Sequence, residues 1–261
     1  MLDAIYTSLS ALHSQQVRLD ITSNNLANVN TTGFKKQRAV FSDLVYPAGQ
    51  NRDGADPAEV AQGPAFDGFG TRISRIRPEF SVGDLRQTGR TLDLAIQGQG
   101  FFEVERADGS LAYTRLGSLS LNDAGELTTA DGLKLTHGVQ IPSDAITVIV
   151  DKNGVVSAKV PDQAQAIELG QLELANFTNP EGLAQVGDGL YKSTDDSGEV
   201  FMSNPDENGV GVLRQGFLEA SNVDFVEELV ELSMAQRAYQ MNARVLQAAD
   251  EMLAEVNGLR R

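Results

Sequence analysis

The sequence predicts an α+β protein whose N- and C-terminal helices pair as a coiled-coil-like hairpin beside a central all-β domain of the barrel or sandwich kind. Near both ends of the chain, apolar residues recur at spacings of three and four, which is the period of an amphipathic helix. Between the ends the pattern changes to short alternating runs, separated by turn residues about every eight to twelve positions. A turn-rich stretch after the first helix predicts a long extended loop or hairpin.

The first helix is expected over residues 2–30. Gly33 follows it and is suited to the left-handed conformation that often ends a helix. Its mostly apolar stripe consists of Leu2, Ile5, Leu9, Leu12, Gln16, Leu19, Ser23 and Leu26.

The last helix is expected over residues 223–256. Residues 221–224 match a capping box, and the acidic residues just after them complement the helix macrodipole. Its stripe consists of Val223, Val226, Val230, Met234, Met241, Val245, Ala248, Met252 and Val256. The stripe follows a repeat of roughly 11 residues, which keeps one face in line over many turns. Arg237 interrupts it, and we expect its side chain to reach solvent or an acidic partner.

Two apolar stripes at opposite ends of one chain most simply cover each other. In the simplest alternative, the two helices fold into one hairpin within the chain and have no further function. The stripe of the last helix is wide, however, because five more large apolar residues flank it, and two helices alone cannot bury so broad a surface. We therefore favour assembly with neighbouring copies. The flanking residues are Phe225, Leu229, Leu232, Leu246 and Leu253.

The predicted domains follow from these patterns. Residues 1–33 and 222–261 form a helical domain, residues 34–70 an extended connector, and residues 71–221 the β domain. Long, weakly patterned connectors are often functional. The strands expected in the β domain cover residues 92–96, 101–105, 111–115, 146–150, 155–160, 167–177 and 210–218.

Composition excludes several classes of function. The net charge of −15 opposes binding to nucleic acid. No apolar run reaches the roughly 20 residues that span a bilayer. The N-terminus lacks the basic and apolar regions of a cleavable signal peptide. The chain contains no Cys, so it has neither disulfides nor thiolate metal sites.

No motif predicts catalysis, a cofactor or a metal. His13 and His137 are the two histidines, and the sequence places no acidic cluster beside either of them. Gly98-Gln99-Gly100 lacks the third glycine of a nucleotide loop, so a tight turn before a strand is expected. The acidic turns at 195–199 and 206–209 lack the full spacing of a calcium loop.

Several segments resemble those of the flagellar rod and hook proteins. Residues 24–35, Asn-Asn-Leu-Ala-Asn-Val-Asn-Thr-Thr-Gly-Phe-Lys, are similar to the N-terminal signature of that family. Residues 216–223, Gly-Phe-Leu-Glu-Ala-Ser-Asn-Val, and the stretch 236–242 resemble its C-terminal end. Residues 96–102 and 113–118 resemble landmarks of its β domain. Within the family, the length, residues 37–41 and the ending Asn257-Gly258-Leu259 are most similar to subunits of the distal part of the rod, with the proximal rod and the hook as alternatives.

The resemblance implies a structural, non-enzymatic subunit without cofactors. It would assemble with copies of itself into an open helical tube, with the terminal helices inside and the β domain outside. Its partners would be the proximal rod proteins, the hook protein and the ring bushing around the rod. It would lie in the flagellar basal body, in the part of the rod that spans the periplasm, after type III export without a cleavable signal. The extra loop within 47–70 would stiffen the shaft.

Spacing and resemblance together predict the residues of the assembly interface. These are Leu9, Leu12, Asn24, Asn25, Leu26, Asn28, Val230, Gln236, Arg237, Met241 and Met252. The apolar members would make contacts between helices, the asparagines would satisfy backbone groups, and Gln236 and Arg237 would act as polar locks. A glycan-binding module or a wall hydrolase would need an aromatic platform or a catalytic signature, yet aromatic residues make up 6% of the chain and there is no Trp.

Overall fold

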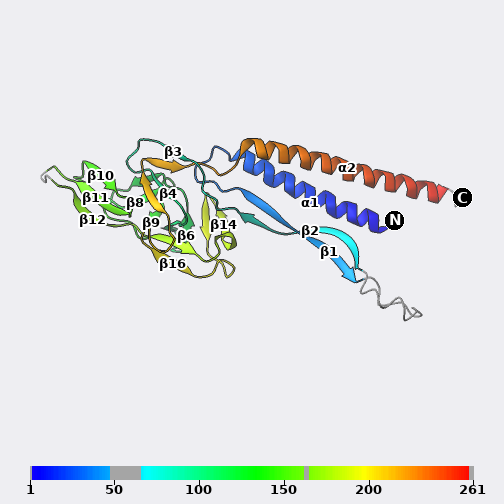
Figure 1. The fold of residues 1–261 in the computed structure, drawn as a ribbon, viewed down its shortest axis with the longest axis horizontal. Coiled ribbons are helices and arrows are strands. Elements are labelled where there is room, and N and C mark those ends of the chain that lie inside the picture. The colour runs from blue at the N-terminus through cyan, green and yellow to red at the C-terminus, as the bar shows by residue number, and fades with distance from the viewer. Residues whose placement is uncertain (1, 48–65, 162–164, 259–261) are drawn as a thin grey trace. The chain divides into compact units, whose positions relative to one another are not determined.

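A computed structural model describes residues 2–47, 66–161 and 165–258 (Figure 1). The chain divides into two compact units. The first, here called the helical unit, contains Met1–Leu26, Gln37–Arg77 and Asp224–Arg261. The second, here called the β unit, contains Ala27–Lys36 and Pro78–Val223. Most of the turn-rich stretch to which the sequence assigned a stiffening role, residues 48–65, lies outside the described residues.

The two predicted helices are present. Helix α1 spans Leu2–Ala27 and helix α2 spans Phe225–Gly258. Helix α1 ends before the predicted residue 30, and the chain turns with a bond from the Thr31 amide to the Asn28 carbonyl. Gly33 does adopt a φ of +67°. Its role as a helix cap was wrongly predicted, however, because its amide donates to the Glu219 carbonyl.

Helix α2 begins with a different cap from the predicted one. The Asp224 carboxylate accepts hydrogen bonds from the backbone amides of Val226 and Glu227 at 2.8 and 3.0 Å. Asp224 is therefore the N-cap residue, and the prediction of a capping box starting at Ser221 is wrong. The Ser221 hydroxyl instead accepts from the Val223 amide, before the helix starts. An acidic residue at the cap also complements the helix dipole.

Helices α1 and α2 run antiparallel and side by side (Figure 1). Arg18 pairs with Glu231 at 2.5 Å, and the Asn25 amide donates to Glu228 at 3.3 Å. The buried face of α2 carries Glu228, Ala235 and Ala249, which are small or polar. The expectation that the two apolar stripes cover each other is therefore wrong, because this seam uses another face of α2.

The predicted connector contains a two-stranded ribbon of two long strands, β1 at Gln37–Pro47 and β2 at Phe66–Pro78. The ribbon contacts α1 through Gly70, which has a φ of +106°. A Cβ atom on Gly70 would lie 2.0 Å from the Ser10 hydroxyl oxygen, which accepts a hydrogen bond from the Thr71 amide. Glycine is therefore required for this close approach.

The β unit contains sixteen short described strands and one 3₁₀ turn, η2 at Pro180–Gly182. The strands are β3 Leu85–Gln87, β4 Leu94–Gln97, β5 Phe102–Glu105, β6 Leu111–Thr114, β7 Leu119–Leu121, β8 Leu127–Thr129, β9 Lys134–Leu135, β10 Thr147–Val150, β11 Val155–Lys159, β12 Ile167–Gln171, β13 Leu174–Phe177, β14 Ala184–Gly187, β15 Leu190–Lys192, β16 Val200–Ser203, β17 Val212–Gln215 and β18 Phe217–Glu219.

These strands form several separate sheets. The largest has the order β14-β15-β6-β5-β9-β8-β7, and a three-stranded sheet has the order β10-β11-β12. The remaining pairs are β13-β16, β17-β4 and β18-β3. Among the described strands no sheet closes on itself, so the barrel alternative in the predicted fold is wrong.

Two predicted strands are each divided in two. The stretch 167–177 contains β12, which pairs with β11, and β13, which pairs with β16. The stretch 210–218 is divided at Gly216, whose φ of +76° ends β17 before β18 begins. In both cases the alternating pattern continues while the hydrogen-bonding partner changes.

The core of the β unit has two parts. One apolar cluster joins strands of several sheets and includes Ile96, Phe102, Val104 and Leu174. The second is aromatic: Phe101, Tyr113, Phe177 and Tyr191 pack edge to face with centroid separations of 4.8 to 6.2 Å. Large side chains are thus fully buried here, as in an independently stable domain.

Candidate assembly interface

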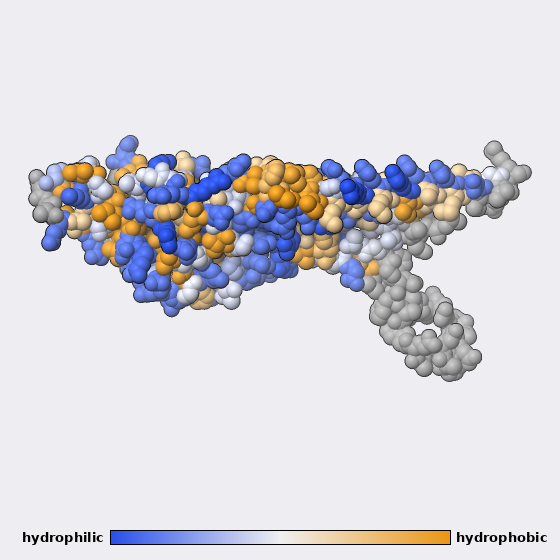
Figure 2. Space-filling model, turned by 45° about the horizontal axis from the view of Figure 1, so that its top comes forward, coloured by the Kyte–Doolittle hydropathy of each residue, from blue (hydrophilic) through white to orange (hydrophobic). Residues whose placement is uncertain are grey.

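Exposed large apolar side chains form a row along the outer face of α2, here called the α2 stripe. Its members are between 40% and 67% exposed. They are Phe225, Val226, Leu229, Val230, Met234, Met241, Val245 and Met252. Apolar surface over the helical pair is visible in Figure 2. Soluble monomers rarely expose contiguous apolar patches beyond a few hundred Å², and larger ones mark interaction sites.

The apolar residues predicted at the interface differ in exposure. Leu9 of α1 is exposed, as are Val230, Met241 and Met252 of the α2 stripe. The other two, Leu12 and Leu26 of α1, are half-buried.

The predicted polar locks also face solvent. Gln236 and Arg237 are both exposed, and Arg237 has no ion-pair partner within the described part of the chain. Arg237 lies on the α2 stripe, as the sequence predicts, because it is three residues after Met234 and four before Met241. A charged side chain in this position is available to a group outside this chain.

The three predicted asparagines have different surroundings. Asn24 is exposed, and Asn28 accepts a hydrogen bond from the Thr31 hydroxyl at 3.1 Å. Asn25 is buried and binds the backbone of Gln37 on both sides, donating to its carbonyl at 3.0 Å and accepting from its amide at 2.9 Å. The side-chain amide of Asn25 also donates a hydrogen bond to the Glu228 carboxylate. Asn25 therefore fixes the start of β1 and the first turns of α2 against α1.

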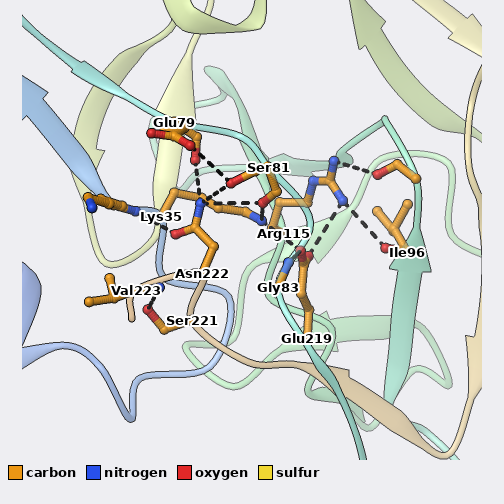
Figure 3. Close-up of polar contacts among 12 residues, drawn as sticks. Lys35, Glu79, Ser81, Gly83, Ile96, Arg115, Glu219, Ser221, Asn222 and Val223 are labelled. Carbon is orange, nitrogen blue, oxygen red and sulfur yellow. Dashed lines mark hydrogen bonds and ion pairs between the residues drawn. The ribbon is translucent and has the colours of Figure 1, made fainter. Parts of the chain in front are cut away.

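A buried ion cluster lies in the β unit (Figure 3). Glu219 accepts from Lys35 Nζ at 2.6 Å and lies 3.5 Å from an Arg115 guanidinium nitrogen. All three side chains are at most 2% exposed. Lys35 also donates to the Ser81 carbonyl at 2.7 Å, and Arg115 to the Gly98 carbonyl at 2.8 Å.

The cluster holds two cations around one carboxylate. Burial lowers the pKa of Lys35, and the adjacent Glu219 carboxylate opposes that effect. Burial likewise lowers the pKa of Arg115, although a guanidinium remains protonated in proteins. The carbonyl oxygens that accept from both side chains offset the excess positive charge. So does the Phe101 ring, whose centroid lies 5.2 Å from the Arg115 guanidinium carbon.

Backbone contacts surround the ion cluster. The Gly83 amide donates to the Glu219 carboxylate at 2.9 Å. The Asn222 side chain accepts from the Lys36 amide at 2.7 Å and donates to the Glu79 carbonyl at 2.8 Å. The segment that follows α1 in the sequence is therefore tied to the segment that precedes α2. Sequence reasoning did not identify this cluster, although its three ions come from the segments that carry the family resemblance.

No arrangement within the described residues assigns catalysis. Two small cavities open on the β unit. One, of about 300 Å³, is lined by Arg106 and by acidic residues in turns. The other, of about 220 Å³, is lined by Arg86 and Glu219 among others. No group of three potential metal ligands occurs in the described residues. His137 has two acidic neighbours, with Glu103 at 3.5 Å and Glu173 at 3.4 Å.

Sequence profiles of three flagellar domains match the chain. The profile described as "Flagella basal body rod protein" matches residues 5–35. "Flagellar hook protein FlgE/F/G D1 domain" matches residues 95–158, and "Flagellar basal body rod FlgEFG protein C-terminal" matches residues 214–259. The first and third matches include the two segments whose Lys35 and Glu219 meet in the ion cluster.

Similar proteins match over nearly the whole chain. The flagellar basal-body rod protein FlgG of Borreliella burgdorferi is 40% identical over 265 residues, covering 100% of both chains. FlgG of Buchnera aphidicola is 39% identical over 258 residues, covering 98% of this chain and 99% of its own. The rod protein FlgF of Caulobacter vibrioides is 34% identical, covering 96% and 94%. The solved hook protein FlgE2 of Helicobacter pylori is 14% identical, covers 71% of this chain and 43% of its own, and has a TM-score of 0.25.

The chain has a terminal helix at each end of a β-rich middle, and large apolar side chains are exposed along one face of α2. The chain belongs to the family of flagellar basal-body rod and hook proteins, and so to the structural components of the flagellar basal body. Among the described residues, no helix has the length and apolarity needed to cross a membrane.

Proposed function

We propose that this protein is a structural subunit of the distal rod, in which copies of the chain form a hollow helical tube that transmits torque to the hook. Exported subunits would pass through the tube. The observation that carries the proposal is the α2 stripe, an apolar face along a helix of 34 residues that nothing in the described part of the chain covers. Identity to FlgG proteins over the full length, at 39–40%, supports the rod rather than another basal-body component.

In such a tube, α1 and α2 would pack like a coiled coil in the inner layer, and the β unit would lie outside. An open tube requires heterologous contacts, in which one surface of a subunit meets a different surface of the next. The helical unit exposes two different surfaces that could meet in such a contact, the α2 stripe and the part of α1 that carries Leu9. Gln236 and Arg237 would then lock neighbouring helices, and the predicted residues of α1 would contribute lateral contacts.

The partners at the two ends of the distal rod would be the proximal rod proteins and the hook protein, and the ring bushing would surround it. The chain would leave the cell by type III export without a cleavable signal and would bind neither nucleic acid nor membrane. It would have no catalytic activity. A Cys-free chain suits this route, because no disulfide can form before the subunit reaches the tip.

The test is deletion of the gene, followed by electron microscopy of purified basal bodies. The proposal expects truncated rods and loss of motility, with both restored by the full chain. A version lacking residues 222–261 should restore neither. Complete rods in the deletion strain would contradict the proposal.

The alternatives predict other outcomes. A proximal rod subunit would give basal bodies that end earlier than those lacking only the distal segment. An exported glycan-binding module would bind peptidoglycan in a pull-down and would still bind after residues 222–261 are removed.

A further inference from the structure

The α2 stripe repeats itself at a fixed interval. Val230, Met241 and Met252 are each separated by 11 residues, as are Met234 and Val245. Three turns of an α-helix take about 11 residues, so residues at this spacing share one face. The stripe therefore coincides with itself when one copy of α2 is displaced along its axis by about 16.5 Å.

One pair of charged residues on the same face has the same interval. Arg244 and Glu255 are 11 residues apart, and both are exposed. Arg237 lies 10 residues after Glu227. Within the described residues neither arginine has an ion-pair partner, and nor does Glu255. The face thus has acidic residues at both ends and basic residues in the middle.

This charge order distinguishes between ways of packing two copies of α2. Parallel helices in register would place Arg237, Arg244 and Glu255 each beside its own copy, so like charges would meet. Antiparallel helices centred on Met241 would place Glu227 level with Glu255. A parallel shift of 11 residues instead places Arg244 of one copy level with Glu255 of the next. The same shift brings Arg237 of one copy beside the acidic first turn of α2 in the other copy. The apolar residues of the two α2 stripes still face each other.

We propose that the α2 stripe docks against α2 of a second copy of this chain, parallel and displaced by 11 residues, with Arg244 of one copy paired with Glu255 of the other. This proposal rests on the proposed function, because it specifies the register of the contact that assembly requires. Apolar burial supplies the attraction, and the charges select the register.

Cysteine cross-linking in cells tests the register, because the natural chain has no Cys. A strain lacking the chromosomal copy produces two variants together, Val230→Cys with Met241→Cys, or Met241→Cys with Met252→Cys, and is treated with a short bismaleimide. Both pairs should give cross-linked dimers, whereas each variant produced alone should give severalfold less. Dimers from the single variants at the same yield would show an in-register contact and overturn the proposal, as would the absence of dimers from both pairs.

Charge exchange provides an independent measurement. Arg244→Glu and Glu255→Arg should each reduce the number of complete rods, by roughly two- to fivefold if one exposed ion pair per contact is lost. The double exchange should restore it. Asp250→Arg, which makes the same charge change on another face of α2, is the matched control and should have no effect. Failure of the double exchange to restore rods would overturn the register.

Complementation of the deletion strain with the natural chain distinguishes a failure of the proposed function from a failure of the proposed register. If it fails to restore rods to the deletion strain, the proposed function itself is wrong. If it restores rods while the cross-links and the charge exchange contradict the 11-residue shift, only the register is wrong.

Discussion

The helical unit and the β unit bury opposite kinds of residue. The β unit encloses large apolar and aromatic side chains and an ion cluster whose members are at most 2% exposed. The helical unit buries Ala235, Ala249, Asn25 and Glu228 and leaves the large side chains of α2 in solvent. A chain that folded only for its own stability would do the reverse in its helices. The β unit thus buries its large side chains within one copy, and we propose that the helical unit is completed by other copies.

The two units also differ in how they hold charge. Lys35, Glu219 and Arg115 are buried together, whereas Arg18 and Glu231 are each 37% exposed. Breaking a buried ion cluster leaves a charge without its partner in a medium of low polarity. Water replaces the lost partner of an exposed pair. Substitutions in the two units should therefore differ greatly in their cost.

The largest effect is expected for Glu219→Ala in the β unit. It would leave the Lys35 and Arg115 cations buried without their carboxylate, at a cost of about 3–5 kcal/mol in the free energy of unfolding. Urea unfolding followed by circular dichroism measures this. Lys134→Ala, which breaks an exposed pair with Glu126, is the control. Equal costs for the two variants would contradict the account of the cluster.

A smaller effect is expected for Asn25→Ala in the helical unit. The substitution removes both hydrogen bonds to the Gln37 backbone and the one to Glu228, and leaves buried groups unsatisfied. The cost should be about 1–3 kcal/mol. Hydrogen exchange of the amides at the start of β1 and in the first turns of α2 should accelerate. Ser23→Ala, at an exposed position of α1, should leave that exchange unchanged.

Alkaline pH should act on the β unit through Tyr113. Burial, with a contribution from Glu103, raises the pKa of Tyr113 to about 12. The unfolded chain releases this phenol proton near pH 10. It thus binds fewer protons than the folded chain between the two values, and stability falls as pH rises from about 10 to 12. Tyr113→Phe should make this fall shallower in urea unfolding over that range. An unchanged slope would show that Tyr113 does not contribute to it.

The smallest effect is expected for Arg18→Ala, which removes the exposed pair with Glu231. Its cost should be below about 1 kcal/mol and should decrease further at high salt. Thermal unfolding at low and high ionic strength measures it. A cost comparable to that of Glu219→Ala would remove the contrast between the two units.

The sequence predicted what depends on local pattern. The helices were found because their period persists over many turns, and β5, β6, β10 and β11 because clear turn residues bound them. The division of 167–177 into β12 and β13 was missed, since alternation does not reveal which strand is the partner. The cap at Asp224 was missed because Ser221 offers the same motif three residues earlier.

The interface residues could be predicted from the sequence pattern, whereas the ion cluster could not. The α2 stripe could be predicted from spacing alone. The seam of Ala235 and Ala249 that leaves it uncovered depends on how α1 packs, which spacing does not specify. Lys35 and Glu219 are 184 residues apart, and Arg115 and Glu219 are 104 apart. No local pattern indicates that these three charges meet.

The central claim, that the helical unit is completed by other copies, is tested most directly by replacing Val230, Met241 and Met252 of the α2 stripe with Ser together. Because these side chains are already exposed in the single chain, the free energy of unfolding of the purified monomer should change by less than about 1 kcal/mol. Complete rods should be absent when this variant replaces the natural chain in the deletion strain. Normal rods, or a monomer that no longer folds, would contradict the claim.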